Sequence, residues 1–157
     1  MFKTWTANAI SELLQDRDKS YFIPEEIRER LVWLVENSFI SKETFYDDAM
    51  KQVDLSTALA FLQGFFNESV EESQTNIDRM HGAYINKNKF TEEFTKTGKP
   101  VTKSDTLLDA EMSMDERFVK ARLDLAAKKR FQTITDRMLW ALKDRALLID
   151  LFARKDR

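Results

Sequence analysis

The sequence predicts an all-α, oligomeric protein, in which a long antiparallel helical hairpin carries a small N-terminal helical subdomain. The turns of sheet proteins rely on glycine and proline, yet the 157 residues contain only 3 Gly and 2 Pro. Apolar residues recur instead at helical spacing over two long stretches, which is typical of amphipathic helices. Both observations argue against a many-stranded β-sandwich and against a glycine-rich nucleotide-binding α/β fold.

Residues 1–53 are expected to form the small subdomain. A first helix is predicted over residues 6–16, and a second opens at Pro24, because the fixed φ of proline suits the first helical position. Ser41 is expected to cap a short third helix. The apolar stripes of these helices are Ile10, Leu13 and Leu14, then Ile27, Leu31, Leu34 and Val35, then Phe45, Ala49 and Val53.

A long helix is predicted from Asp54 to about Lys96. Its apolar side repeats with spacings of four and three residues, as in a heptad pattern. Gly98 and Pro100 are expected to end it, because glycine terminates helices and proline cannot continue them. The predicted inward positions are Leu55, Leu59, Leu62, Phe66, Ser69, Ser73, Ile77, Met80 and Tyr84.

A loop with at most one helical turn is expected over residues 97–113, and a second long helix over residues 114–154. Two helices of matched length joined by a Gly-Lys-Pro linker predict an antiparallel pair. Such a pair has little core for its length, so we expect identical copies to cover the remaining apolar surface in a homo-oligomer. The expected domains are residues 1–53 and 54–157.

The composition argues against several functional classes. The chain has no cysteine and a single histidine, His81, which removes disulfide scaffolds, zinc fingers and thiol chemistry. We expect no catalysis and no cofactor. The first residues lack the pattern of a secretory signal, and no apolar run reaches the roughly 18 residues of a membrane span. A cytoplasmic protein is expected.

The two halves of the chain differ in charge. Residues 1–80 contain 8 Lys/Arg and 15 Asp/Glu, a balance of −7, whereas residues 81–157 contain 17 and 12, a balance of +5. Such asymmetry is typical of a nucleic-acid surface or of two ends that attract each other in an assembly. It is equally compatible with solvated helix faces that happen to differ.

Lysines and aromatic residues gather where the two long helices are expected to meet. Lysine contacts to phosphates release counterions, and aromatic rings offer bases a stacking surface. The candidate nucleic-acid-binding residues are Tyr84, Lys87, Lys89, Phe90, Lys96, Lys99 and Lys103, with Phe94 among them and only Glu92 and Glu93 opposing. The alternative is a tip that lysines merely keep soluble.

Two acidic groups and a second basic run are further candidate sites. Glu25, Glu26 and Glu29 resemble the EExxE stretch of all-α nucleotide pyrophosphatases, but Glu43 and Asp47 do not supply the required second motif. Acids favoured by a helix N-terminus explain them better. A solvated loop and helix cap likewise explain the second acidic cluster better than a metal does, so no metal site is expected. That cluster is Asp105, Asp109, Glu111, Asp115 and Glu116; the second basic run is Lys120, Arg122, Lys128, Lys129 and Arg130.

The C-terminal part of the chain resembles UvsY-like phage recombination mediators, over about 85 residues from about Glu71 onward. The resemblance implies a non-enzymatic homo-oligomer that binds single-stranded DNA and helps a recombinase displace single-strand-binding protein. It also implies that the DNA contacts lie around Tyr84 to Lys89. The positions that fit the family pattern are Asp115, Lys120, Leu125, Leu139, Ala141, Leu142, Lys143 and Arg145.

Three functional hypotheses follow. The first is a single-stranded-DNA-binding recombination mediator of a phage. The second is a helical protein-interaction module, either a phage structural component or an inhibitor of host defence, that never touches nucleic acid. The third is a metal-dependent nucleotide hydrolase built on Glu25, Glu26 and Glu29, for which we expect no turnover.

Overall fold

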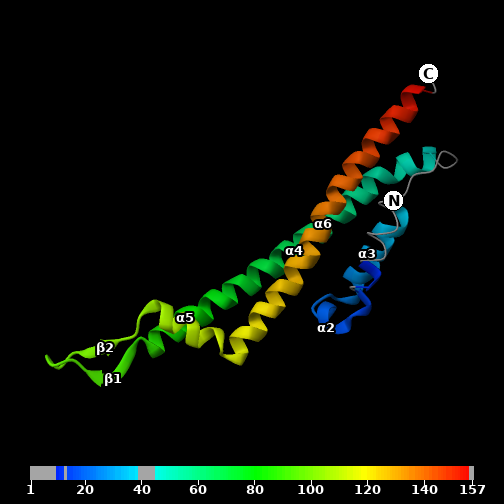
Figure 1. Ribbon diagram of the computed structural model, residues 1–157. Coiled ribbons are helices and arrows are strands. Elements are labelled where there is room, and N and C mark those ends of the chain that lie inside the picture. The colour runs from blue at the N-terminus through cyan, green and yellow to red at the C-terminus, as the bar shows by residue number, and fades with distance from the viewer. Residues whose placement is uncertain (1–9, 13, 39–44, 156–157) are drawn as a thin grey trace. The chain divides into compact units, whose positions relative to one another are not determined.

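The computed structural model describes residues 10–12, 14–38 and 45–155. The described chain is mostly α-helical, which confirms the predicted class, with one small antiparallel sheet. The chain divides into two compact units. The first unit comprises residues 1–67 and 129–157, and the second comprises residues 68–128. The elements are α2 (Arg17–Ser20), α3 (Glu25–Asn37), α4 (Phe45–Asn88), β1 (Phe90–Phe94), β2 (Pro100–Thr102), α5 (Asp105–Ser113) and α6 (Glu116–Lys155) (Figure 1).

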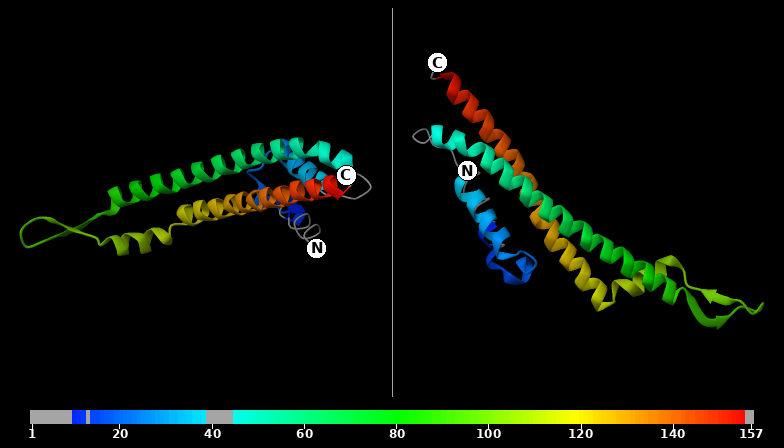
Figure 2. Two further views of the ribbon diagram at one scale, coloured as in Figure 1. Left: turned by 90° about the horizontal axis from the view of Figure 1, so that it is seen from above. Right: turned by 180° about the vertical axis from the view of Figure 1, so that it is seen from behind.

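In the first unit, α3 packs on antiparallel portions of α4 and α6 (Figure 2). Gln52, near the start of α4, donates a hydrogen bond to the Leu142 carbonyl at 3.1 Å. Further along α4, the Phe66 ring stacks on Phe131 with centroids 5.5 Å apart. These two contacts show that α4 and α6 run antiparallel in this unit. The buried core consists of Ile10, Ile23, Ile27, Leu31, Leu34, Leu55, Leu59, Leu62, Phe66, Phe131, Met138 and Leu142.

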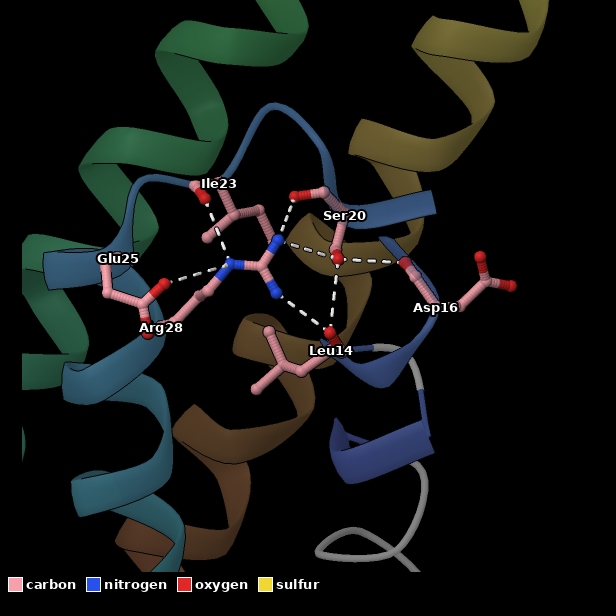
Figure 3. A network of polar contacts seen from close by, with 6 residues as sticks. All are labelled: Leu14, Asp16, Ser20, Ile23, Glu25 and Arg28. Atoms are coloured by element: carbon pink, nitrogen blue, oxygen red, sulfur yellow. Dashed lines mark hydrogen bonds and ion pairs between the residues drawn. The ribbon is translucent and has the colours of Figure 1, made fainter. Parts of the chain in front are cut away.

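Arg28 fastens the start of α3 to the segment before it (Figure 3). Its guanidinium donates to the carbonyls of Leu14 at 2.8 Å, Ser20 at 2.6 Å and Ile23 at 3.2 Å. The Ser20 hydroxyl, itself buried, donates to the Asp16 carbonyl at 2.9 Å. Buried carbonyls without partners are costly, so the arginine adds donors to a turn whose own backbone hydrogen bonds, such as that from the Ile23 N–H to the Ser20 carbonyl at 3.0 Å, do not reach the Ile23 carbonyl.

The second unit combines a smaller apolar core with polar contacts between its helices. Ser73 of α4 is buried, and its hydroxyl donates to Asp124 at 2.8 Å while accepting from the Lys128 ammonium at 2.7 Å. Lys128 also pairs with Asp124 at 3.0 Å. Each polar group in this network therefore has a partner, as burial requires. The apolar core of the unit is Ile77, Met112 and Phe118.

The long central helix begins earlier and ends earlier than the sequence predicted. Instead of starting at Asp54, α4 starts at Phe45 and absorbs the predicted third short helix. Ser41, the expected cap, lies outside the described residues. The predicted domain boundary after residue 53 consequently falls inside α4. The helix ends at Asn88 rather than near Lys96, because the following residues pair as strands.

The predicted loop over residues 97–113 is also wrong in most of its length. Residues 100–102 form β2, and Asp105–Ser113 form α5. The Ser104 hydroxyl accepts a hydrogen bond from the Leu107 N–H at 3.3 Å, which caps this helix. Its Leu108 and Met112 side chains are buried. A capping hydrogen bond and two buried apolar side chains thus stabilise a helix in a segment whose apolar pattern is too short to predict one.

Candidate nucleic-acid interface

The predicted basic tip is a β-hairpin that follows the carboxyl end of α4 and leads into α5 (Figure 2). β1 and β2 are antiparallel, with Phe90 opposite Thr102, Phe94 opposite Pro100 and an irregularity in between. The Lys103 N–H donates to the Lys89 carbonyl at 2.8 Å and extends the pairing toward the base.

Residues 96–98 form the connecting loop. The Thr95 N–H donates to the Lys99 carbonyl at 2.7 Å, and the Gly98 N–H donates to the Thr95 carbonyl at 2.8 Å. Gly98 has φ of 78°, the left-handed conformation that closes a three-residue hairpin loop. Gly98 was expected to end a helix, but it closes the hairpin turn instead. Threonine and phenylalanine favour strands, so the FTEEFT composition was the signal that could have predicted β1.

Four of the five predicted lysines are exposed on this hairpin or immediately before it. Lys87 lies in the last turn of α4, Lys89 precedes β1, and Lys96 and Lys99 flank the turn. Among the described side chains, no carboxylate lies within ion-pair distance of these four ammonium groups. Residues 84–103 hold 5 Lys against 2 Glu. These four lysines therefore present positive charge to solvent, with no ion-pair partner among the side chains that the structure describes.

Two phenyl rings of β1 are exposed beside these lysines. Phe90 is 57% exposed and Phe94 is 68% exposed. Phe90 is one of the predicted contact residues, and Phe94 is the aromatic residue predicted to lie among them. Apolar side chains stabilise a fold through burial, so rings this exposed contribute little to the stability of the protein. Unpaired bases stack on such rings without regard to sequence.

The remaining two predicted residues, Tyr84 and Lys103, converge on Glu111 of α5. The Lys103 ammonium lies 2.7 and 2.8 Å from the two Glu111 carboxylate oxygens. The Tyr84 hydroxyl donates to Oε2 of the same carboxylate at 3.3 Å, and the Tyr84 ring packs against the core of the second unit. Tyr84 is therefore half-buried, and its hydroxyl is engaged within the second unit rather than free in solvent.

These contacts shift the ionisation of both acidic partners. The Lys103 hydrogen bond holds the pKa of Glu111 below its usual 4.5. Burial, followed by the nearby Glu111 carboxylate, raises the pKa of the Tyr84 hydroxyl above its usual 10.0. Glu111 is thus a carboxylate and Tyr84 a neutral donor at neutral pH. This role of Glu111 could not be predicted from the sequence, because Glu111 stands in a run of acids without ordered spacing.

The second basic run does not form one surface. The Lys128 ammonium is taken up by Asp124 and Ser73, and Arg122 lies over the Phe118 ring at 5.6 Å from its centroid. Lys120, Lys129 and Arg130 are exposed on α6. Part of this run therefore serves packing within the helix pair.

The acids considered as metal ligands are occupied elsewhere or exposed. Glu25 lies 4.0 Å from Arg28, and Glu26 pairs with Arg30 at 2.8 Å. Within the described ranges, no three His, Cys, Asp or Glu side chains gather as a metal site would require. Glu43 falls outside those ranges. His81 lies 3.1 Å from Asp109, so the lone histidine bridges α4 and α5.

Comparison with known proteins gives no relative. The chain matches no protein-family model, no curated protein and no solved structure. Over the part of the chain that the structure describes, no helix is both long enough and apolar enough to cross a membrane. The role of the hairpin is therefore inferred from its own geometry.

Proposed function

We propose that this protein binds single-stranded nucleic acid, DNA foremost, through the β1–β2 hairpin, and that it acts without catalysis. The observation that carries the proposal is the combination, in and next to one short hairpin, of two exposed phenyl rings with four exposed lysines that have no ion-pair partner among the described side chains. Lysines bind the phosphates and the rings stack on unpaired bases. A duplex keeps its bases stacked on each other, so the rings favour a single strand.

The resemblance to UvsY-like mediators extends this proposal to a biological role. Such a protein coats single-stranded DNA in a phage-infected cell and assists a recombinase against single-strand-binding protein. The partners proposed on that basis are single-stranded DNA, a recombinase and a single-strand-binding protein.

A salt titration with a labelled oligothymidylate tests the binding itself. Each phosphate contact to a single strand contributes about −0.7 to the slope of log affinity against log salt. Four lysines therefore predict a slope of about −3. An affinity that does not change between low and high salt would refute the electrostatic premise.

A charge-reversal variant locates the site. Replacing Lys87, Lys89 and Lys99 by Glu is expected to abolish binding and to leave helicity unchanged, because all three side chains are exposed. The matched control carries the same charge change at exposed residues of α6, namely Lys120→Glu, Lys129→Glu and Arg130→Glu. Equal loss of binding in both variants would show that net charge, not the hairpin, attracts the nucleic acid.

Self-association is the second proposal, and the exposed apolar faces of the first unit favour it. On α6, Trp140, Leu147 and Leu151 recur at helical spacing opposite the buried stripe and are 66%, 63% and 54% exposed. On α4, Ala60 and Gly64 are exposed, with open space where a Gly64 Cβ would lie. Large side chains on one helix and small ones on another are complementary surfaces for a second copy of this chain.

Light scattering of the chain with and without oligonucleotide separates the two proposals. A homo-oligomer in the absence of DNA that dissociates on replacement of Leu147 and Leu151 by Lys supports self-association. An oligomer that does not bind the oligonucleotide at low salt favours the protein-interaction module over the nucleic-acid-binding protein. A monomer refutes the self-association proposal.

A further inference from the structure

Lys103 differs from the other four lysines of the hairpin region. Its backbone N–H donates to the Lys89 carbonyl, so it stands at the base of the hairpin where β2 ends. Its ammonium is held by both carboxylate oxygens of Glu111 at 2.7 and 2.8 Å. The side chain is only 25% exposed. In this state one of the five positive charges is already neutralised by the protein itself.

Glu111 also engages the residue on the other side of the hairpin. Tyr84 precedes β1 along the chain, Lys103 follows β2, and the Glu111 carboxylate from α5 accepts hydrogen bonds from both. A carboxylate and a phosphate both offer an ammonium two negatively charged acceptor oxygens. Glu111 therefore gives Lys103 the same kind of charge-assisted contact that a nucleic-acid phosphate would give.

We propose that Glu111 is a built-in competitor of the nucleic-acid phosphate for Lys103, and that it limits the affinity of the hairpin for single strands. The inference rests on the proposed function of the hairpin and names the regulation of that same site. When a strand binds with Glu111 in place, four lysines neutralise phosphates. When the Glu111 carboxylate is removed, Lys103 becomes the fifth lysine that neutralises a phosphate.

This competition has a measurable signature in the salt dependence. One additional phosphate contact steepens the log–log slope by about 0.7. Between 50 mM and 200 mM salt, a Glu111→Gln variant is therefore expected to lose about 2.6-fold more affinity than the unchanged chain. At 50 mM salt the variant is expected to bind several-fold more tightly.

The experiment measures fluorescence anisotropy of a labelled oligothymidylate with the full chain. Asp109→Asn is the matched control, since Asp109 lies on the same helix, carries the same charge and pairs with His81 rather than with a lysine. A double variant, Glu111→Gln with Lys103→Met, removes both partners and is expected to lose the gain. Circular dichroism checks that each variant is helical.

The outcomes separate the two levels of the proposal. The competition is supported by three results together. Glu111→Gln binds more tightly with a steeper salt slope, Asp109→Asn keeps the slope of the wild type, and the double variant loses the gain in affinity. If Glu111→Gln and Asp109→Asn gain affinity equally and neither has a steeper salt slope, Glu111 acts only as a negative charge that repels the nucleic acid. That result would overturn the inference. Weaker binding by Glu111→Gln would also overturn it, since the carboxylate would then be positioning the hairpin. An unchanged chain that binds no oligonucleotide at 50 mM salt refutes the proposed function itself.

Discussion

Truncating Phe94 to alanine separates binding from stability more sharply than any other single change on the hairpin. The ring is 68% exposed, so little of its surface is buried in the fold. The free energy of unfolding is expected to change by no more than about 0.5 kcal/mol, as at other exposed sites. Stacking of one base on an aromatic side chain contributes about 1–3 kcal/mol to binding. The affinity for oligothymidylate is therefore expected to fall by about 5-fold to about 150-fold.

Anisotropy titration at fixed salt measures the affinity, and urea unfolding followed by circular dichroism measures the stability. Phe94→Tyr keeps a stacking face and is expected to bind nearly as well as the unchanged chain, whereas Phe94→Leu keeps an apolar side chain without a π face. Phe94→Leu should therefore resemble the alanine variant. The reasoning fails if Phe94→Ala binds normally, or if Phe94→Leu binds as tightly as Phe94→Tyr.

Three further predictions concern the structure that supports the site. Arg28→Met removes one donor from each of three carbonyls, of which the Leu14 and Ser20 carbonyls keep a second donor, and is expected to lower the free energy of unfolding in urea by about 1–3 kcal/mol. Gly98→Val forces a β-branched residue into φ of 78° and is expected to cost about 1–2 kcal/mol, with weaker oligonucleotide binding by anisotropy. The pKa of Glu111 is lowered in the fold, so its ion pair stabilises fully above its unfolded value near 4.5 and is lost as pH falls through the lower folded value. The acid unfolding of Glu111→Gln, followed by circular dichroism, should lack this component; identical pH profiles would contradict it.

Periodicity predicted the helical class and much of the buried stripe of α4. Leu55, Leu59, Leu62 and Phe66 recur at spacings of four, three and four, and all four are buried as expected. The reason is geometric, since 3.6 residues per turn bring these positions to one face whatever the partner is. The same rule could not locate the ends of the helix, because fraying, caps and strand pairing decide them.

The site was only partly readable from the residues. Charge and aromatic composition singled out Lys87, Lys89, Phe90, Lys96 and Lys99, and these side chains are indeed exposed. That reading requires only local composition, because unpaired lysines on a short segment stay in water. The pairing of Lys103 with Glu111 could not be read in the same way. It depends on α5, a helix in a segment that the sequence predicts to be a loop.

The amino-acid sequence by itself determined that this chain is mostly helical, and that its positive charge concentrates between residues 84 and 103. Both properties follow from local composition and period. Only the tertiary structure decided that this segment is a hairpin of strands, and which of its cations remain unpaired. Those outcomes depend on which distant groups come within hydrogen-bond distance, as Glu111 does with Tyr84 and Lys103, and the chain must fold before such distances exist.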